Sequence, residues 1–187
     1  MGLDMYLMRK TYVQQWEHQR LEKRNEVQVW RGGQPRPDID PAKVSHVIEQ
    51  MGYWRKANAI HQWFVTNVQD GEDDCKDYYV SREQLKELRD LCQLVLDGSV
   101  LIPGKVVTSI VYDEQNPKGR EETKPDGMVV YNPELAEERL PTTSGFFFGG
   151  TEYDEYYIQD LQHTIDIIDP ILAIEDDEAD YYYHSSW

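Results

Sequence analysis

Apolar residues recur at two different spacings along the chain, and each spacing indicates a type of secondary structure. Leu3, Met5 and Leu7 alternate with Asp4, Tyr6 and Met8, the period of two expected of a strand with one buried face. We predict a strand over residues 2–8. A second short strand is expected over residues 26–30, closed by Gly32 and Gly33, and the two strands are expected to pair as a hairpin.

The middle of the chain changes to helical spacing. Asp40 followed by Pro41 has the form of a helix N-cap with proline at the first helical position. The pattern therefore predicts a helix from residue 41, interrupted or kinked at Gly52 and continued to about Val68. Its first apolar stripe consists of Val44, Val47, Ile48 and Met51.

A second helix is marked by signals at both ends. Ser81 and Gln84 form a capping box, and Gly98 follows the last apolar position. The residues at helical spacing between them, which we expect to be buried, are Leu85, Leu88, Cys92 and Val95.

The C-terminal part predicts a hairpin, a third helix and a tail. Residues 105–112 and 128–131 are rich in β-branched residues and are expected to pair across a long charged loop. Thr151 and Asp154 make a capping box ahead of an apolar stripe that Pro170 is expected to end. The sequence predicts one α+β domain over residues 1–174, a small antiparallel or mixed sheet with about three helices, and an acidic, tyrosine-rich tail over 175–187.

The net charge of the chain limits the classes of partner that are expected. The chain has 187 residues and a formal net charge of -16, and residues 140–187 contain 11 Asp and Glu but no Lys or Arg. Direct nucleic-acid binding is disfavoured, and a basic protein is the expected partner. No apolar run is long enough for a membrane span or a signal peptide, so we expect a cytoplasmic protein, with homo-oligomers left open.

One tract of the predicted helix gathers candidate binding residues. Trp54, Asn58 and His61 fall at i, i+4 and i+7, so on a helix they share one face. They could stack and hydrogen-bond a nucleobase, with Arg55 or Lys56 near its phosphate. The alternative is a core helix whose His and Asn side chains are satisfied by backbone groups.

A glycine- and phenylalanine-rich segment precedes the last predicted helix. Residues 145–150 read Gly-Phe-Phe-Phe-Gly-Gly, and Thr142, Thr143 and Ser144 stand just before them. The segment is either a buried strand that leads into a capped helix or a functional loop in which these three hydroxyls donate to a ligand. It lacks the G-x-x-x-x-G-K pattern of a phosphate loop.

Metal and thiol chemistry receive little support. The five histidines show no metal-binding i, i+4 pair, and Cys75 and Cys92 lack C-x-x-C spacing. We therefore predict no metal, no cofactor and no catalytic residue.

Acidic and aromatic side chains are interleaved near the C-terminus. Such a surface resembles a nucleic acid in charge and stacking and could occupy a basic groove of another protein, although a solubilising tail would have a similar composition. The predicted partner-binding residues are Glu152, Asp154, Glu155, Tyr156, Asp160, Asp176, Asp177, Tyr181 and Tyr182.

Three blocks of sequence carry a resemblance. Residues 1–7 (MGLDMYL), 53–65 (YWRKANAIHQWFV) and 143–157 (TSGFFFGGTEYDEYY) resemble those of a family of small uncharacterised phage, prophage and bacterial proteins. The resemblance implies an accessory protein of a mobile element and transfers no catalytic residue.

Two functions follow as hypotheses. The first is a non-enzymatic inhibitor of a basic, nucleic-acid-handling host protein, by analogy a CRISPR nuclease, that uses the acidic surface. The second is a nucleotide or small-molecule binder, acting as a sponge or a nucleotide-processing enzyme, that uses the Trp/Asn/His pocket.

Overall fold

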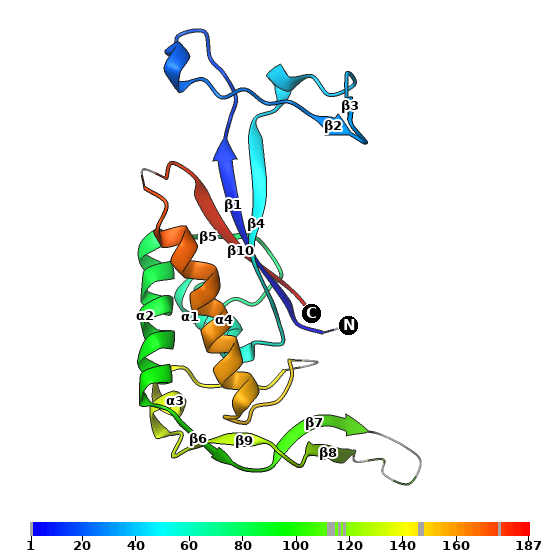
Figure 1. Cartoon of the computed structure of the whole chain (residues 1–187), viewed down its shortest axis with the longest axis vertical. Coiled ribbons are helices and arrows are strands. Elements are labelled where there is room, and N and C mark those ends of the chain that lie inside the picture. The colour runs from blue at the N-terminus through cyan, green and yellow to red at the C-terminus, as the bar shows by residue number, and fades with distance from the viewer. Residues whose placement is uncertain (1, 112–114, 116, 118, 146–147, 176) are drawn as a thin grey trace.

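The structure is a computed structural model that describes residues 2–111, 115, 117, 119–145, 148–175 and 177–187. In these residues it is an α+β fold with four α-helices (Figure 1). The helices are α1 (Asn58–Asn67), α2 (Arg82–Gly98), α3 (Glu134–Arg139) and α4 (Glu155–Leu172). The strands are β1 (Asp4–Tyr12), β2 (Trp30–Arg31), β3 (Gln34–Pro35), β4 (His46–Arg55), β5 (Tyr78–Val80), β6 (Val100–Pro103), β7 (Val106–Val111), β8 (Arg120–Lys124), β9 (Met128–Tyr131) and β10 (Asp180–Ser186).

The main sheet is antiparallel, with strand order β4-β1-β10-β5, and three two-stranded ribbons accompany it. Helices α1, α2 and α4 lie on one side of this sheet, as Figure 1 shows. The core forms between them: Met5 and Leu7 of β1 and Tyr183 of β10 are buried with Leu161 and Ile168 of α4. Alternation along β1 and β10 thus directs every second side chain toward the helices.

Residues 13–45 leave the sheet between β1 and β4 and form a projecting segment, which we call the N-terminal arm (Figure 1). It contains the β2-β3 hairpin and two short 3-10 turns, Leu21–Lys23 and Pro41–Lys43. Of the arm residues whose burial is described, only Val13 is buried. The arm therefore has almost no core of its own.

The capping box predicted for α2 is confirmed, whereas the box of Thr151 and Asp154 predicted for α4 does not form, because Asp154 is itself the N-cap. The capping box of Ser81 and Gln84 is present in both directions, and Leu85, Leu88, Cys92 and Val95 are the buried residues of α2. In α4, Asp154 is the N-cap and accepts from the backbone N–H groups of Tyr156 and Tyr157. Pro170 lies inside the last turn of α4 and does not end the helix, which continues to Leu172.

The helix predicted over residues 41–57 is wrong. Asp40 does cap a turn that begins at Pro41, but this turn is a 3-10 helix of three residues. From His46 the chain forms β4, which pairs with β1 along its length, and α1 begins only at Asn58. Pairing with the N-terminal strand satisfies the β4 backbone on one side, and this long-range contact outweighs the local helical spacing.

Neither of the two predicted strand pairings forms. β1 pairs with β4 and β10, so the expected hairpin with residues 26–30 does not form. β7 pairs with β8, and β9 pairs with β6, so the two predicted strands near residues 105–112 and 128–131 have different partners.

The prediction of a C-terminal tail is wrong. Residues 180–186 form β10, which lies between β1 and β5 in the main sheet. Tyr181 and Tyr183 are buried on its inner side. Their rings supply core volume that the helices cover, so the acidic composition of the segment does not make it a solvated tail.

Candidate functional site

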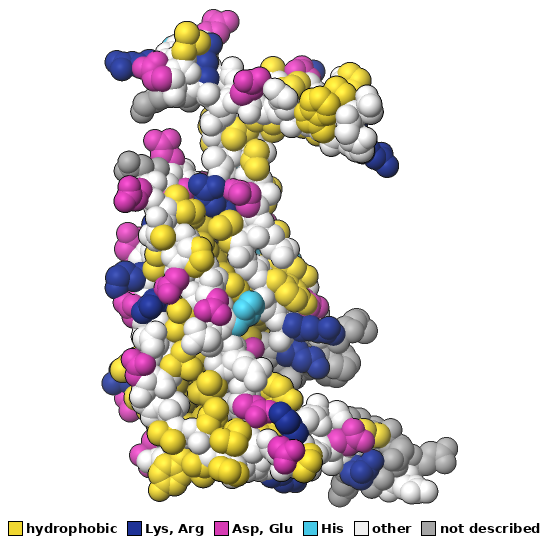
Figure 2. All heavy atoms as spheres, viewed as in Figure 1, with side chains coloured by type: hydrophobic (Ala, Val, Ile, Leu, Met, Phe, Trp, Pro, Cys, Tyr) yellow, Lys and Arg dark blue, Asp and Glu magenta, His cyan; other side chains and the backbone are white. Residues whose placement is uncertain are grey.

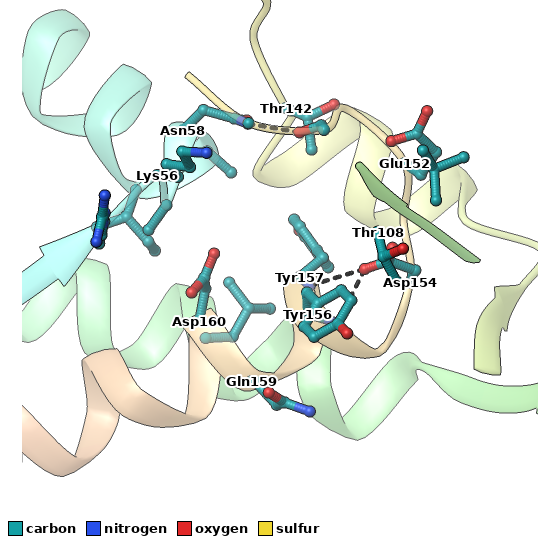
Figure 3. A pocket seen from close by; sticks show the side chains of 18 residues that line it. Lys56, Asn58, Thr108, Thr142, Glu152, Asp154, Tyr156, Tyr157, Gln159 and Asp160 are labelled. Atoms are coloured by element: carbon teal, nitrogen blue, oxygen red, sulfur yellow. Dashed lines mark hydrogen bonds between the residues drawn. The ribbon is translucent and has the colours of Figure 1, made fainter. Parts of the chain in front are cut away.

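A cavity of about 340 Å³ lies where β4 ends, α1 begins and α4 begins (Figure 3). Side chains from four separate stretches of chain line it: the β4–α1 junction, β7, the segment 142–152 and the first turns of α4. This volume is at the lower end of the range for pockets that hold small molecules.

The β4–α1 junction is held in an unusual backbone conformation. Lys56 has a backbone φ of 63°, a value that residues other than glycine rarely adopt. Its backbone N–H donates to the carbonyl of Leu3 at 2.8 Å, and its carbonyl accepts from Asn58 N at 2.8 Å. Backbone strain of this kind is found at functional sites more often than elsewhere, and it costs about 1–3 kcal/mol.

Gly149 closes one side of the cavity by approaching Lys56. It has a φ of 94°, and a Cβ atom there would lie 3.2 Å from the Lys56 Cβ and 3.3 Å from the Lys56 carbonyl oxygen. Glycine therefore suits this position in both backbone conformation and space.

Asn58 ties the segment 143–150 to the start of α1. Its side-chain oxygen accepts from Thr143 N at 3.0 Å, and its side-chain nitrogen donates to the carbonyls of Phe148 and Gly150 at 3.2 and 2.6 Å. Because these contacts use most of the amide's hydrogen-bonding capacity, Asn58 shapes the cavity wall and has little left for a ligand.

Two cations at the cavity are unpaired. Arg55 and Lys56 are exposed, and in the described part of the chain neither forms an ion pair or a side-chain hydrogen bond. In a chain with 35 Asp and Glu residues, two adjacent cations without a carboxylate partner are available to an anionic group.

The acidic side of the cavity contains Asp154 and Asp160. Burial raises the pKa of Asp154, although its bonds to the N–H groups of Tyr156 and Tyr157 act in the opposite direction. Burial, with a smaller effect from the Asp154 charge, raises the pKa of Asp160 to about 7. The Asp160 carboxyl group faces the cavity (Figure 3) and has no hydrogen-bond partner among the described residues.

The arrangement separates charges of opposite sign across one small space. An anionic group can bind to Arg55 and Lys56, while an N–H group of the same molecule can donate to ionised Asp160. Tyr156, 44% exposed at the rim, offers a ring for stacking.

Trp54 and His61, predicted for the pocket, belong to the core instead. Trp54 lies on β4, not on the helix with Asn58, and donates to the hydroxyl of Thr164 at 2.9 Å. His61 is buried, with Nδ1 2.7 Å from the Tyr183 hydroxyl and Nε2 3.0 Å from an Asp73 oxygen. The shared helical stripe was a wrong prediction because residue 54 is in a strand.

Of the three hydroxyl groups predicted to meet a ligand, that of Thr142 belongs to a residue that lines the cavity, whereas Thr143 and Ser144 do not line it. Thr108, Tyr157 and Gln159 also line the cavity and are not among the residues predicted from the sequence. No local signal marks Thr108, because β7 reaches the cavity only through tertiary packing.

The predicted acidic, tyrosine-rich surface is not continuous. The Asp177 side chain is buried and paired with Arg9 at 2.7 Å and Arg82 at 3.3 Å, and the buried Tyr181 donates to it. These two residues are not free to contact a partner.

The other residues predicted to bind a partner lie in different parts of the structure. Glu155 is paired with Lys124 at 2.6 Å, and Asp154 caps α4. Glu152, Tyr156 and Asp160 line the cavity. Tyr182 lies on the face of the sheet away from the helices, and Asp176 lies outside the described residues.

The described residues contain no group of three or more His, Cys, Asp or Glu side chains arranged to hold a metal ion, and no helix among them is long and apolar enough to cross a membrane. Burial raises the pKa of the Cys92 thiol to about 12, which keeps it protonated near neutral pH.

Comparison with protein-family models, curated proteins and solved structures gives no match to this chain.

Proposed function

We propose that this protein binds a small molecule that carries both an anionic group and an N–H donor, with nucleotides as the class that best combines them. The observation that carries the proposal is the pair of unpaired cations, Arg55 and Lys56, in the same cavity as the unpartnered carboxyl group of Asp160. The phosphate would bind to the cations, and an amino or imino edge of the base would donate to Asp160.

This arrangement keeps the ligand class expected from the sequence but changes the residues that recognise it. Tyr156 at the rim would stack on the base, and Asp160 would accept a hydrogen bond from it. Asn58 shapes a wall of the cavity, whereas Trp54 and His61 lie in the core and do not line it.

The proposed acidic-surface inhibitor has less support in the structure. It needs a continuous set of accessible carboxylates and tyrosines, whereas Asp177 and Tyr181 are buried and Glu155 is ion-paired. The resemblance to phage and bacterial proteins remains a sequence-based expectation.

Isothermal titration with nucleoside monophosphates, the matching nucleosides and inorganic phosphate tests the proposal. We expect the monophosphates to bind more tightly than either the nucleosides or phosphate alone, since each of those fills only half of the cavity. Arg55→Gln should weaken monophosphate binding about 10- to 100-fold, as for loss of a charged hydrogen bond of about 1.5–3 kcal/mol.

Two further variants separate the two halves of the site. Asp160→Asn should weaken monophosphates and leave phosphate binding unchanged, and Lys56→Gly should weaken both while relieving the positive φ. Arg120→Gln, at an exposed position on β8, is the matched control. The proposal fails if no monophosphate binds, or if Arg55→Gln and Arg120→Gln bind it equally well.

A further inference from the structure

The face of the main sheet that points away from the helices is more apolar than a solvated sheet face should be. In register, Tyr6 lies opposite both Tyr53 and His184, and Tyr182 lies opposite both Met8 and Tyr79. Antiparallel sheets with one wet face usually place polar residues there. This outer face carries charged side chains as well, but it also presents a cluster of tyrosines with Met8 and Ile48, and such a cluster is typical of an interaction surface.

These side chains enclose a groove of about 390 Å³. Its walls include Tyr6, Met8, Ile48 and Tyr182. The Tyr6 and Tyr53 rings are 5.3 Å apart, and Lys10 Nζ lies 5.7 Å from the centre of the Tyr182 ring. Ile48, on the edge strand β4, is 62% exposed.

The N-terminal arm begins at the end of this same sheet and exposes further large apolar side chains. Trp16, Leu21 and Trp30 are all more than half exposed. Figure 2 shows hydrophobic atoms at the surface of the projecting arm. A segment of this length with one buried residue gains little from its own packing, so contacts with another molecule would be needed to cover it.

The charge on the outer face argues for one kind of partner. By register, the face carries Lys10 and, at the end of β4 that also borders the cavity, Arg55, against Asp4, Asp77 and Asp180, close to neutral in a chain of net charge -16. A nucleic acid would need an excess of cations, and a basic protein would be drawn to an acidic face. A neutral, tyrosine-rich face best fits a contact face that is itself neutral and apolar.

The N-terminal arm is also close to neutral in net charge. It contains six Lys and Arg against five Asp and Glu, so the remaining 13 cations and 30 acids give the rest of the chain a charge of -17. The outer sheet face and the arm are thus adjacent surfaces that lack the net negative charge of the rest of the molecule.

We propose that the outer sheet face and the N-terminal arm form an interface with a second copy of this chain, related to the first by a two-fold axis. The four strands have 10, 9, 7 and 3 residues, and at about 3.4 Å per residue and about 4.8 Å between strands they give the face a footprint of roughly 470 Å². A stable interface buries about 800 Å² on each partner. The sheet face alone falls short of this, and the exposed apolar groups of the arm supply the remainder.

Sedimentation velocity of the full chain without added ligand, over a range of protein concentrations, tests this inference with variants that lie outside the cavity. We expect a reversible dimer. Ile48→Glu on the sheet and Trp30→Ser on the arm should each raise the dimer dissociation constant at least tenfold, because each places a polar group in an apolar contact. Both positions are exposed, so folding should be retained, and thermal melting checks this.

Tyr131→Ala is the matched control, since Tyr131 is 65% exposed on β9, outside the main sheet. It should leave the dissociation constant unchanged. Salt gives a second readout: between about 0.05 M and about 0.5 M sodium chloride the dimer should become tighter, because screening reduces the repulsion between two chains that each carry a charge of -16.

Three outcomes would overturn the inference. The first is a monomer at every concentration and salt level, and the second is a dimer that Ile48→Glu and Trp30→Ser do not weaken. The third is binding of a single-stranded oligonucleotide or a polylysine probe that those variants abolish and salt weakens, since this assigns the surface to a different partner.

Discussion

Single residues in this protein owe their roles to contacts that lie far away in sequence. His61 bridges the Tyr183 hydroxyl and Asp73, joining α1, β10 and the loop before β5. The sequence identifies His61 as a polar residue on an apolar stripe, and both hypotheses made for it were consistent with that position. Only the position of β10 shows that the buried hydroxyl of Tyr183 is one of its partners.

The Tyr183 hydroxyl should contribute measurably to stability. Tyr183→Phe keeps the stacked contact with Phe64, whose ring centre lies 3.9 Å away, but leaves His61 Nδ1 buried without its partner. We expect a loss of about 1–3 kcal/mol in the free energy of unfolding, measured by urea denaturation. Tyr182→Phe, one residue along on the outer face, should change it by less than about 0.5 kcal/mol.

Asp160 should make stability depend on pH. Its pKa is about 7 in the folded protein, above the value of 3.8 for an ordinary Asp, so the folded state binds the proton more tightly than the unfolded state. Relative to Asp160→Asn, the wild type should therefore lose stability as the pH rises from about 4 through about 7.

With allowance for the partial exposure of Asp160, the loss should be of the order of 2 kcal/mol above pH 8. Thermal melting of both proteins at pH 4 and pH 8 measures it. An equal difference between the two proteins at both pH values would show that Asp160 keeps its ordinary pKa.

Among the elements, α2 is fully specified by its own sequence. Its capping box is local, and its apolar stripe has the spacing that brings one face to the core. By contrast, β4 has apolar residues whose spacing imitates a helix, and its strand conformation depends on pairing with β1. Sequence patterns therefore predict an element correctly where its hydrogen bonds join residues that are close in sequence.

Truncation of the α2 stripe gives a direct test of its packing. Leu88 is completely buried, so Leu88→Ala should cost about 2–5 kcal/mol in the free energy of unfolding, through lost apolar burial and a residual cavity. Chemical denaturation measures this loss. The neighbouring Glu87→Ala, at an exposed position, should have little effect. A loss below about 0.5 kcal/mol for Leu88→Ala would mean that the stripe does not face a packed core.

At the scale of the whole molecule, the C-terminal strand β10 connects β1 to β5 within the main sheet. Removal of residues 180–187 would leave β1 and β5 without their shared partner and would expose the space that Tyr181 and Tyr183 fill. We expect the shortened chain to lose its cooperative unfolding transition, as followed by circular dichroism. Removal of Trp187 alone, beyond the end of β10, should retain it. A cooperative transition in the chain that ends at Ala179 would show that β10 is dispensable.

The sequence by itself determined the α+β class, α2 and most of α4. These features depend on caps and on apolar residues within a few positions of one another, so their physics is contained in short segments. The tertiary structure alone decided that residues 180–186 are a central strand and that Asp160 shares a cavity with Arg55. In β10 three successive tyrosines hide the alternation between buried and exposed faces, and its pairing with β1 joins opposite ends of the chain, a contact that no local pattern encodes.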